Sequence, residues 1–382
     1  MISEPIKSEI LKLFEKDRSG YYVFIKNKFI ENIRNFKSTF SSSGNNLKLA
    51  YSIKANYHPD LIKIASNEHL CFDCASLMEL NFLLTNGIPA NKIWVNTPFL
   101  NHELLDLCIK NEILINVDSL EQLIEIENAA SAQNKKVEIG IRFNLSELEA
   151  SRFGIETDDE RMLKLMSVLN SSKNIDVKVL HIHYSTPSRD AISYAERAEQ
   201  LFALYLQWFK NFNITTINIG GGLFGPVDID FAKQFENVPP TWNDYASYLQ
   251  DFIKKLKDAN LSLAIEPGMA LVADTFYFLA EVISLKNSRQ LNFAMLNTSK
   301  LFLKPTGHSK QISFEVINSE NTKKDESLNY NLVGITCMEN DLVGQYFGTL
   351  AKGDLIIFKN VGAYTASYRP NFIFAAPETK TI

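Results

Sequence analysis

The feature that most constrains the fold is a series of eight short apolar segments between residues 47 and 266. Each is rich in Val, Ile, Leu and aromatic residues, as expected for a strand that is buried in a parallel sheet. The segments are residues 47–53, 70–75, 92–96, 113–118, 137–144, 177–184, 215–220 and 261–266.

Amphipathic segments lie between these candidate strands, among them HPDLIKIASNE, SLMELNFLLTNG, HELLDLCIKN and SLEQLIEIENAASAQ. Their apolar residues recur every three or four positions, as in a helix that packs on a sheet. Eight strand–helix units in series predict an α/β fold, a (β/α)8 TIM-like barrel over residues 28–275. A doubly wound open sheet is the structural alternative.

The pattern changes after about residue 275, where strand-like segments follow one another with turns and little helix between them. These segments are residues 276–286, 291–297, 310–318, 330–337 and 354–360. They predict a mostly-β domain of residues 276–382. We assign residues 1–27 to it as well, because YYVFIKN (21–27) is also strand-like.

Charge and cysteine content exclude several classes of protein. The net charge of -5 argues against a nucleic-acid-binding protein, which needs clustered Lys and Arg. The chain lacks the apolar stretch of a signal peptide or membrane span, and four cysteines are too few for a disulfide scaffold. We therefore expect a cytoplasmic protein.

Cys71 and Cys74 form a CxxC, but no further ligands follow at metal spacing, so a metal or redox role is only an alternative.

Polar residues follow the candidate strands at their carboxyl ends, which in a barrel converge on one mouth. Lys54, Asp73 and His183 end the first, second and sixth strands, and Glu266 ends the eighth. Each has an ordinary structural explanation: a lysine is usually solvated, a histidine can be a core residue, and a carboxylate can be paired. Their convergence is more informative than any one of them.

The seventh strand is followed by Gly220, Gly221 and Gly222. These form either a simple tight turn or a loop whose backbone N–H groups bind phosphate, a site that barrels often place after strands seven and eight.

His181 and His183 share one strand face and suit a metal pair, but the sequence offers no evident third ligand, so we predict no metal.

One ligand fits a lysine amine, a phosphate loop, a flat histidine and a carboxylate at one mouth, and that ligand is pyridoxal 5′-phosphate. Its aldehyde needs a lysine, its phosphate needs N–H donors, and its ring accepts a stacking partner. A carboxylate keeps its pyridine nitrogen protonated, so that the ring can accept electrons.

The chain resembles the fold-type III pyridoxal-phosphate-dependent decarboxylases, the group of ornithine, diaminopimelate and carboxynorspermidine decarboxylases. The matching motifs run in family order from about residue 45 to 370: YSIKAN, FDCASLMEL, INVDS, IRFN with SRFGI, HIHYST, INIGGGLFG, EPG, CMEND and GAYT. The resemblance implies an alanine racemase-like architecture, in which a barrel that binds the cofactor is followed by a β domain. These enzymes belong to amino-acid metabolism, including lysine and polyamine biosynthesis.

The resemblance also implies residue roles. Lys54 looks like the lysine that bonds to the cofactor, Glu266 like the partner of the pyridinium, and Cys337 like the group that protonates the carbanion. The other cofactor residues implied are Asp73, His183, Thr186, Gly220, Gly221, Gly222, Gly268 and Tyr364, with Glu79 near the lysine; the substrate residues implied are Arg142, Glu339 and Asp341.

The activity implied is α-decarboxylation of an amino acid, either a diamino acid or an amino-acid conjugate, to the amine and CO2. In this family the segment around Cys337 reaches the neighbouring subunit's pocket, which implies a homodimer with shared active sites. A racemase is the first alternative, but alanine racemases pair the pyridine nitrogen with arginine, whereas Glu266 and Cys337 favour decarboxylation. A non-catalytic relative should have lost the lysine or the phosphate loop, and both are present.

The substrate is left open by the sequence. Some relatives act on citrate-conjugated amino acids in siderophore biosynthesis, and Lys300, Lys304, His308 and Lys310 either serve such a polycarboxylate or belong to a solvated loop.

Three motifs depart from the family pattern. Met269 replaces the arginine of EPGR, and HYST replaces HVGS, so Thr186 or Ser185 must supply the hydroxyl. Met338 stands where several relatives have an acidic residue, with Glu339 one place later.

Overall fold

The computed structural model describes residues 2–41, 46–145, 151–183, 190–307, 310–320, 322 and 327–382. The chain divides into two compact units. The barrel unit comprises Ile30–Phe224 and Pro239–Ala270, and the β unit comprises Met1–Phe29, Gly225–Val238 and Leu271–Ile382.

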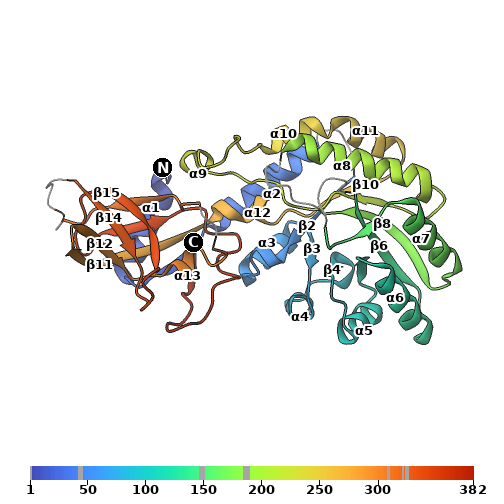
Figure 1. The fold of residues 1–382 in the computed structure, drawn as a ribbon, viewed down its shortest axis with the longest axis horizontal. Coiled ribbons are helices and arrows are strands. Elements are labelled where there is room, and N and C mark those ends of the chain that lie inside the picture. The colour runs from blue at the N-terminus through green and yellow to red at the C-terminus, as the bar shows by residue number, and fades with distance from the viewer. Residues whose placement is uncertain are drawn as a thin grey trace. The chain divides into compact units, whose positions relative to one another are not determined.

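Eight parallel strands close into a ring in the barrel unit, which confirms the predicted (β/α)8 barrel and excludes the open sheet (Figure 1). The closing pair, β5 with β6, places Asn116 opposite Gly140. The strands are β2 (Leu47–Ser52), β3 (Cys71–Cys74), β4 (Ile93–Asn96), β5 (Leu114–Val117), β6 (Val137–Asn144), β8 (Ile175–Ile182), β9 (Thr216–Asn218) and β10 (Ser262–Ile265). Each lies within or overlaps one of the predicted segments. A short strand, β7 (Ile155–Glu156), also pairs with β6.

Helices follow most of these strands because the connecting turns supply caps for the first free backbone N–H groups. Ser76 accepts a hydrogen bond from the N–H of Glu79 (3.2 Å), and Asn101 accepts one from Leu104 (2.8 Å). Ser119 caps α6 in the same way. The helices are α2 (Lys26–Ser41), α3 (Pro59–Asn67), α4 (Leu77–Thr85), α5 (His102–Asn111), α6 (Leu120–Ala132), α7 (Asp159–Ser171), α8 (Ala191–Leu204), α10 (Trp242–Tyr248), α11 (Gln250–Asp258) and α12 (Met269–Val272).

The β unit contains an eight-stranded sheet in which β1 pairs with β11 and with β17. Its strands are β1 (Tyr21–Phe24), β11 (Phe276–Ser288), β12 (Leu291–Leu296), β13 (Phe314–Ile317), β14 (Leu328–Val333), β15 (Leu342–Gly348), β16 (Leu355–Phe358) and β17 (Thr379–Thr381). Its helices are α1 (Glu4–Lys16), α9 (Ile229–Ala232) and α13 (Lys300–Leu303). The five strand-like segments are confirmed, whereas the sequence analysis did not anticipate α1, β15 or β17.

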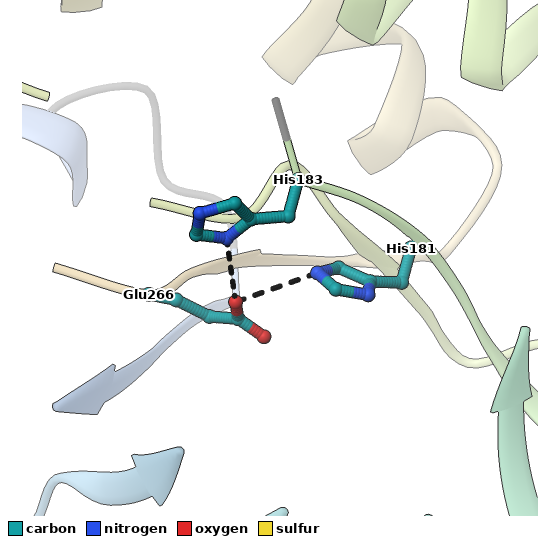
Figure 2. Close-up of side chains that lie close together, drawn as sticks. All are labelled: His181, His183 and Glu266. Atoms are coloured by element: carbon teal, nitrogen blue, oxygen red, sulfur yellow. Dashed lines mark hydrogen bonds and ion pairs between the residues drawn. The ribbon is translucent and has the colours of Figure 1, made fainter. Parts of the chain in front are cut away.

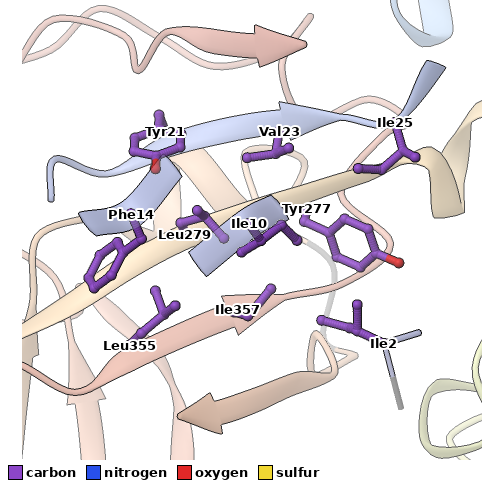
Figure 3. Close-up of a cluster of buried hydrophobic side chains, with 10 residues drawn as sticks. All are labelled: Ile2, Ile10, Phe14, Tyr21, Val23, Ile25, Tyr277, Leu279, Leu355 and Ile357. Atoms are coloured by element: carbon purple, nitrogen blue, oxygen red, sulfur yellow. The ribbon is translucent and has the colours of Figure 1, made fainter. Parts of the chain in front are cut away.

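The core of the β unit explains why the N-terminal residues belong to it. Helix α1 packs the buried side chains of Ile10 and Phe14 against the sheet (Figure 3). The sheet side of this cluster comes from β1, β11 and β16, through Tyr21, Val23, Tyr277, Leu279, Leu355 and Ile357.

The β unit also includes residues 225–238, which the sequence analysis placed inside the barrel domain of residues 28–275. Hydrogen bonds within the β unit account for this assignment. The carboxylate of Asp228 accepts hydrogen bonds from Ser313 Oγ (2.9 Å) and Asn360 Nδ2 (2.6 Å).

Within the residues that the structure describes, no helix has both the length and the apolar character needed to cross a membrane.

Candidate active site

A ring of polar side chains lies at the carboxyl ends of the barrel strands, one from each of the eight. We call it the polar ring: Ser52, Asp73, Asn96, Asn116, Arg142, His181, Asn218 and Glu266. Strand register makes neighbours of several members, since Ser52 lies opposite Asp73 and Asn96 opposite Asn116. All members but Arg142 are buried. Because burial of polar groups in a barrel is costly, the ring marks a candidate site.

Lys54 lies in a single 3-10 turn, Ile53–Ala55, that directly follows β2. Its Nζ atom is 2.9 Å from Oδ2 of Asp73, while the lysine side chain keeps 33% of its surface exposed. The same Asp73 oxygen accepts a hydrogen bond from Ser52 Oγ (2.7 Å). The fully buried carboxylate therefore holds the amine at the mouth of the barrel, as the position of YSIKAN predicts.

Glu266 follows β10 and is 1% exposed. Its Oε1 atom accepts hydrogen bonds from the side-chain amides of Asn96 (2.8 Å) and Asn218 (2.7 Å). Its Oε2 atom lies 3.4 Å from His181 Nε2 and from His183 Nδ1 (Figure 2). Burial on its own would raise the pKa of Glu266, but the two histidines outweigh it and lower that pKa well below the usual range. Glu266 is therefore an anion inside the barrel.

Asn96 connects the lysine to this anion, and sequence reasoning missed it. Its Nδ2 atom donates to Asp73 Oδ1 (2.6 Å) and to Glu266 Oε1 (2.8 Å). Lys54, Asp73, Asn96 and Glu266 thus form one continuous chain of hydrogen bonds. The only sequence signal was a polar residue at the carboxyl end of β4, the position at which the other strands carry theirs.

His183 lies beside this network, directly after β8. Burial lowers the pKa of its imidazole, and the charge on Lys54 acts in the same direction, against the opposing effect of Glu266. The Nδ1 atom of His183 lies 3.2 Å from the backbone nitrogen of Gly221 and 3.4 Å from Oε2 of Glu266. Without a proton it accepts from Gly221, and with a proton it donates to Glu266. The backbone carbonyl of His183 accepts a hydrogen bond from Arg142 Nη2 (2.8 Å).

Arg142 also faces Asp118, with 3.5 Å between Nη1 and Oδ1. Burial is the main cause that raises the pKa of Asp118. These contacts place the guanidinium on the backbone that carries His183. Arg142 therefore helps to position His183. The contact between Arg142 and the substrate, which the resemblance implies, stays a prediction.

The glycine turn after β9 has backbone geometry that a side chain would disturb. Gly220 and Gly222 have φ values of +69° and +90°, which favour glycine. A Cβ on Gly221 would lie 2.4 Å from the carbonyl oxygen of Glu266. Gly268 is similarly confined, because its Cβ would lie 3.1 Å from those of Ser52 and Ala55.

Glu79 has a structural role in the loop between β3 and α4. Its Oε2 atom accepts a hydrogen bond from the N–H of Ala75 (2.6 Å), while its own N–H donates to Ser76. Burial raises the pKa of its carboxyl. Glu79 therefore holds the loop that follows Asp73.

The remaining predicted residues lie elsewhere. Cys337, Glu339, Asp341 and Tyr364 belong to the β unit, and Thr186, Ser185 and His308 lie outside the described residues. Cys337 and Glu339 are exposed and line a surface pocket of about 440 Å³. Tyr364 adopts a φ of +56°.

Asp341 is buried, and both of its carboxylate oxygens are occupied within its own unit. Oδ1 accepts hydrogen bonds from Ser299 Oγ and the N–H of Lys300, and Oδ2 accepts them from the N–H and Oγ1 of Thr336. These bonds hold the segment between β14 and β15 that carries Cys337.

The histidine pair has a third potential metal ligand, which the sequence did not reveal. Donor atoms of His181, His183 and Glu266 lie within 4.8 Å of one another. A cation there would occupy the carboxylate of Glu266 that a cofactor needs. Whether the site suits a metal or a cofactor therefore follows from the family to which the chain belongs. All four cysteines are free, and among the described residues neither Cys71 nor Cys74 joins a cluster of three potential ligands.

Comparison with known proteins decides the family. Residues 26–273 match the family model for the pyridoxal-dependent decarboxylase, pyridoxal binding domain. The chain belongs to this family. It is therefore a pyridoxal-dependent carboxy-lyase that acts on an amino acid, as predicted, and nothing in the comparisons favours a racemase or the decarboxylation of a citrate conjugate.

Curated relatives cover most of the chain. Diaminopimelate decarboxylase from Campylobacter jejuni is 26% identical over 91% of this chain and 86% of the relative. The enzyme of the same name from Aquifex aeolicus is 23% identical over 90% of this chain and 81% of the relative.

Solved structures share the fold. A diaminopimelate decarboxylase from Helicobacter pylori, complexed with L-lysine, matches with a TM-score of 0.84 and 20% identity, covering 98% of this chain and 94% of that one. A lysine/ornithine decarboxylase from Vibrio vulnificus, complexed with putrescine, matches with a TM-score of 0.83 and 18% identity, covering 100% of this chain and 99% of that one.

The residues present fit pyridoxal 5′-phosphate. Glu266 is a buried anion suited to a protonated ring nitrogen, and the turn at Gly220 and Gly221 has no room for a Cβ. In the described part of the chain, Asn96 Oδ1 and His181 Nδ1 are buried without a hydrogen-bond partner, so the site holds polar groups that a ligand can satisfy.

Proposed function

We propose that the protein decarboxylates diaminopimelate or a closely related diamino acid, through the residues of the barrel mouth and Cys337. The observation that carries the catalytic part is the hydrogen-bonded chain from Lys54 through Asp73 and Asn96 to Glu266. It places an amine and a buried anion in one polar network, as this cofactor requires.

The cofactor, when bound, supplies an electron-accepting ring that takes up the electrons left by departing CO2. The protein's residues do the rest. Lys54 is the residue that would bind the cofactor's aldehyde, and Asp73 holds its amine in place. Glu266 would hold the protonated ring nitrogen, as a buried anion in a site where such a charge is most effective.

The glycine turn would hold the phosphate through the N–H of Gly222, because those of Gly220 and Gly221 face Asn218 and His183. Gly268 and Tyr364 are the further contacts proposed.

Cys337 is the proposed proton donor to the substrate carbon, and Glu339 and Asp341 are the proposed substrate contacts. The exposure of Cys337 and Glu339 on the β unit suits a group that meets its substrate in an assembled site. Of the two acidic residues, Glu339 has the more accessible side chain, because the carboxylate of Asp341 is occupied within its own segment.

We also propose a homodimer in which each Cys337 segment completes the partner's site. Large exposed apolar side chains on strands β12 and β15, Leu291, Met295, Leu342 and Phe347, support an interface on this part of the β unit. The four free cysteines support a reducing, cytoplasmic location.

The substrate proposal depends on the relatives, because both curated relatives described above are diaminopimelate decarboxylases. L-Lysine and L-ornithine are the second candidates, given the structural similarity to a lysine/ornithine decarboxylase.

Release of CO2 from meso-diaminopimelate, L-lysine and L-ornithine, with and without added pyridoxal 5′-phosphate, tests the proposal. We expect the highest kcat/KM with diaminopimelate. Higher activity with ornithine or lysine would reassign the substrate, and an absence of cofactor-dependent CO2 release from all three would contradict the proposed function.

A further inference from the structure

Asn96 has an unusual position among the polar ring residues, because its amide contacts two carboxylates from other strands. It is the last residue of β4, and in the order of the barrel strands β3 and β2 lie between β4 and β10. Its side chain nevertheless reaches Glu266, which follows β10, as well as Asp73 on β3. The side chain therefore extends across the barrel interior.

The chemistry of its neighbours fixes the orientation of this amide. Both neighbours are carboxylates, which accept hydrogen bonds when ionised and do not donate them. The NH2 group must therefore face them, one N–H to each. Its Oδ1 atom is left buried without a hydrogen-bond partner among the described residues. An unsatisfied buried carbonyl destabilises a fold, so a purely structural role explains this arrangement poorly.

The two N–H groups act on charge as well as on geometry. A hydrogen bond donated to an ionised carboxylate favours its charged form. Oε1 of Glu266 has two such donors, Asn96 and Asn218. Asn96 also donates to the carboxylate of Asp73, which binds Lys54. The orientation of the Asn96 amide therefore acts on the carboxylates of both Asp73 and Glu266.

We propose that Asn96 is a positioning residue for the cofactor, which fixes the carboxylates of Asp73 and Glu266 so that Lys54 and the ring-nitrogen partner are aligned together. This inference rests on the proposed roles of Lys54 and Glu266. It assigns Asn96 no contact with the reacting atoms.

The barrel provides a matched control in Asn116. This asparagine lies directly opposite Asn96 in the register of β4 and β5, and it is buried as well. Among the described residues, neither Nδ2 nor Oδ1 of Asn116 has a hydrogen-bond partner. The same substitution at both positions therefore removes the same buried amide, with the contacts to Asp73 and Glu266 lost in only one.

The experiment titrates pyridoxal 5′-phosphate into the full-length wild type and into the Asn96→Leu and Asn116→Leu variants, and follows the visible absorbance of the bound cofactor. We expect Asn96→Leu to bind it more weakly than wild type by about tenfold or more, because two hydrogen bonds to charged groups are lost. Its spectrum should change with pH over a range in which that of wild type is constant, because Glu266 holds the ring proton less firmly. Asn116→Leu should keep the wild-type dependence of the spectrum on pH, whatever its affinity, because no hydrogen bond from Asn116 to either carboxylate is among those of the described residues.

A second variant, Asn96→Asp, keeps the shape of the side chain and serves if Asn96→Leu does not fold. It places a third carboxyl between two others, so its cofactor affinity should fall as pH rises, relative to wild type. An affinity with the pH dependence of wild type would overturn the inference.

The outcomes separate this inference from the proposed function. Equal cofactor affinity in wild type and Asn96→Leu, or the same change in the pH dependence of the spectrum in both leucine variants, overturns the role of Asn96 alone. Failure of wild type to bind the cofactor contradicts the proposed function, and the inference with it.

Discussion

Gly221 lies where the turn after β9 passes closest to the chain that follows β10. Replacing it with alanine would put a Cβ 2.4 Å from the carbonyl oxygen of Glu266, so one of the two segments must move. We expect Gly221→Ala to weaken cofactor binding and to lower the free energy of unfolding by about 1–3 kcal/mol, the usual cost of overpacking.

Gly344→Ala is the control, since the nearest atom to its added Cβ would be 3.8 Å away. Chemical denaturation and cofactor titration of the two variants compare them. Unchanged stability and affinity in Gly221→Ala would show that the turn is not confined as described.

Asp17 gives a second prediction about a single residue, on how the free energy of unfolding depends on pH. A hydrogen bond from Lys380 is the largest cause that lowers its pKa from 3.8 to about 2. Because the folded-state pKa is the lower one, this stabilisation is present above pH 3.8 and is lost as pH falls toward 2. The difference in free energy of unfolding between wild type and Asp17→Asn should therefore shrink over that acidic range. A difference that stays constant with pH would contradict the assignment.

The segment between β14 and β15 depends on Asp341. This buried carboxylate accepts four hydrogen bonds from Ser299, Lys300 and Thr336. We expect Asp341→Ala to lower the free energy of unfolding by about 3 kcal/mol, because several buried donors lose their acceptor.

Glu339→Ala is the matched control, because Glu339 lies in the same segment with an exposed side chain. It should leave stability unchanged and raise KM. Urea denaturation with steady-state kinetics distinguishes the two. An Asp341→Ala variant of wild-type stability whose KM alone is raised would favour the substrate role that the sequence predicts.

The elements of the barrel could be predicted because each strand is a short segment rich in apolar residues and the following turns carry helix caps. Strand β15 was missed because side chains such as Leu342 and Phe347 are exposed, so that the segment lacks a buried run. Residues 225–238 were misplaced because side-chain hydrogen bonds, such as those of Asp228, fix their unit.

Some residues of the candidate site could be predicted from the sequence and others could not. Lys54 and Glu266 could be found because their chemistry is rare at the end of an apolar strand. Asn96 was missed because asparagine commonly ends strands, and its two carboxylate partners are 23 and 170 residues away in sequence.

The whole molecule, as proposed, is a dimer with composite sites, and mixing two inactive variants tests this. Lys54→Ala and Cys337→Ala should each lose normal turnover, while the second should still bind cofactor. After the subunits exchange, about a quarter of wild-type activity should return, because about half of the dimers are mixed and each has one intact site. No recovery in a mixture shown by native mass spectrometry to contain mixed dimers would exclude sites shared between subunits.

The central claim is that Lys54 anchors the cofactor at the mouth of the barrel, beside Asp73. Borohydride reduction of the cofactor-loaded protein, followed by peptide mass mapping, tests it most directly. The account predicts one added cofactor per chain, on Lys54, and none in Lys54→Ala. A label on another lysine, or no label in a protein that releases CO2, would contradict it.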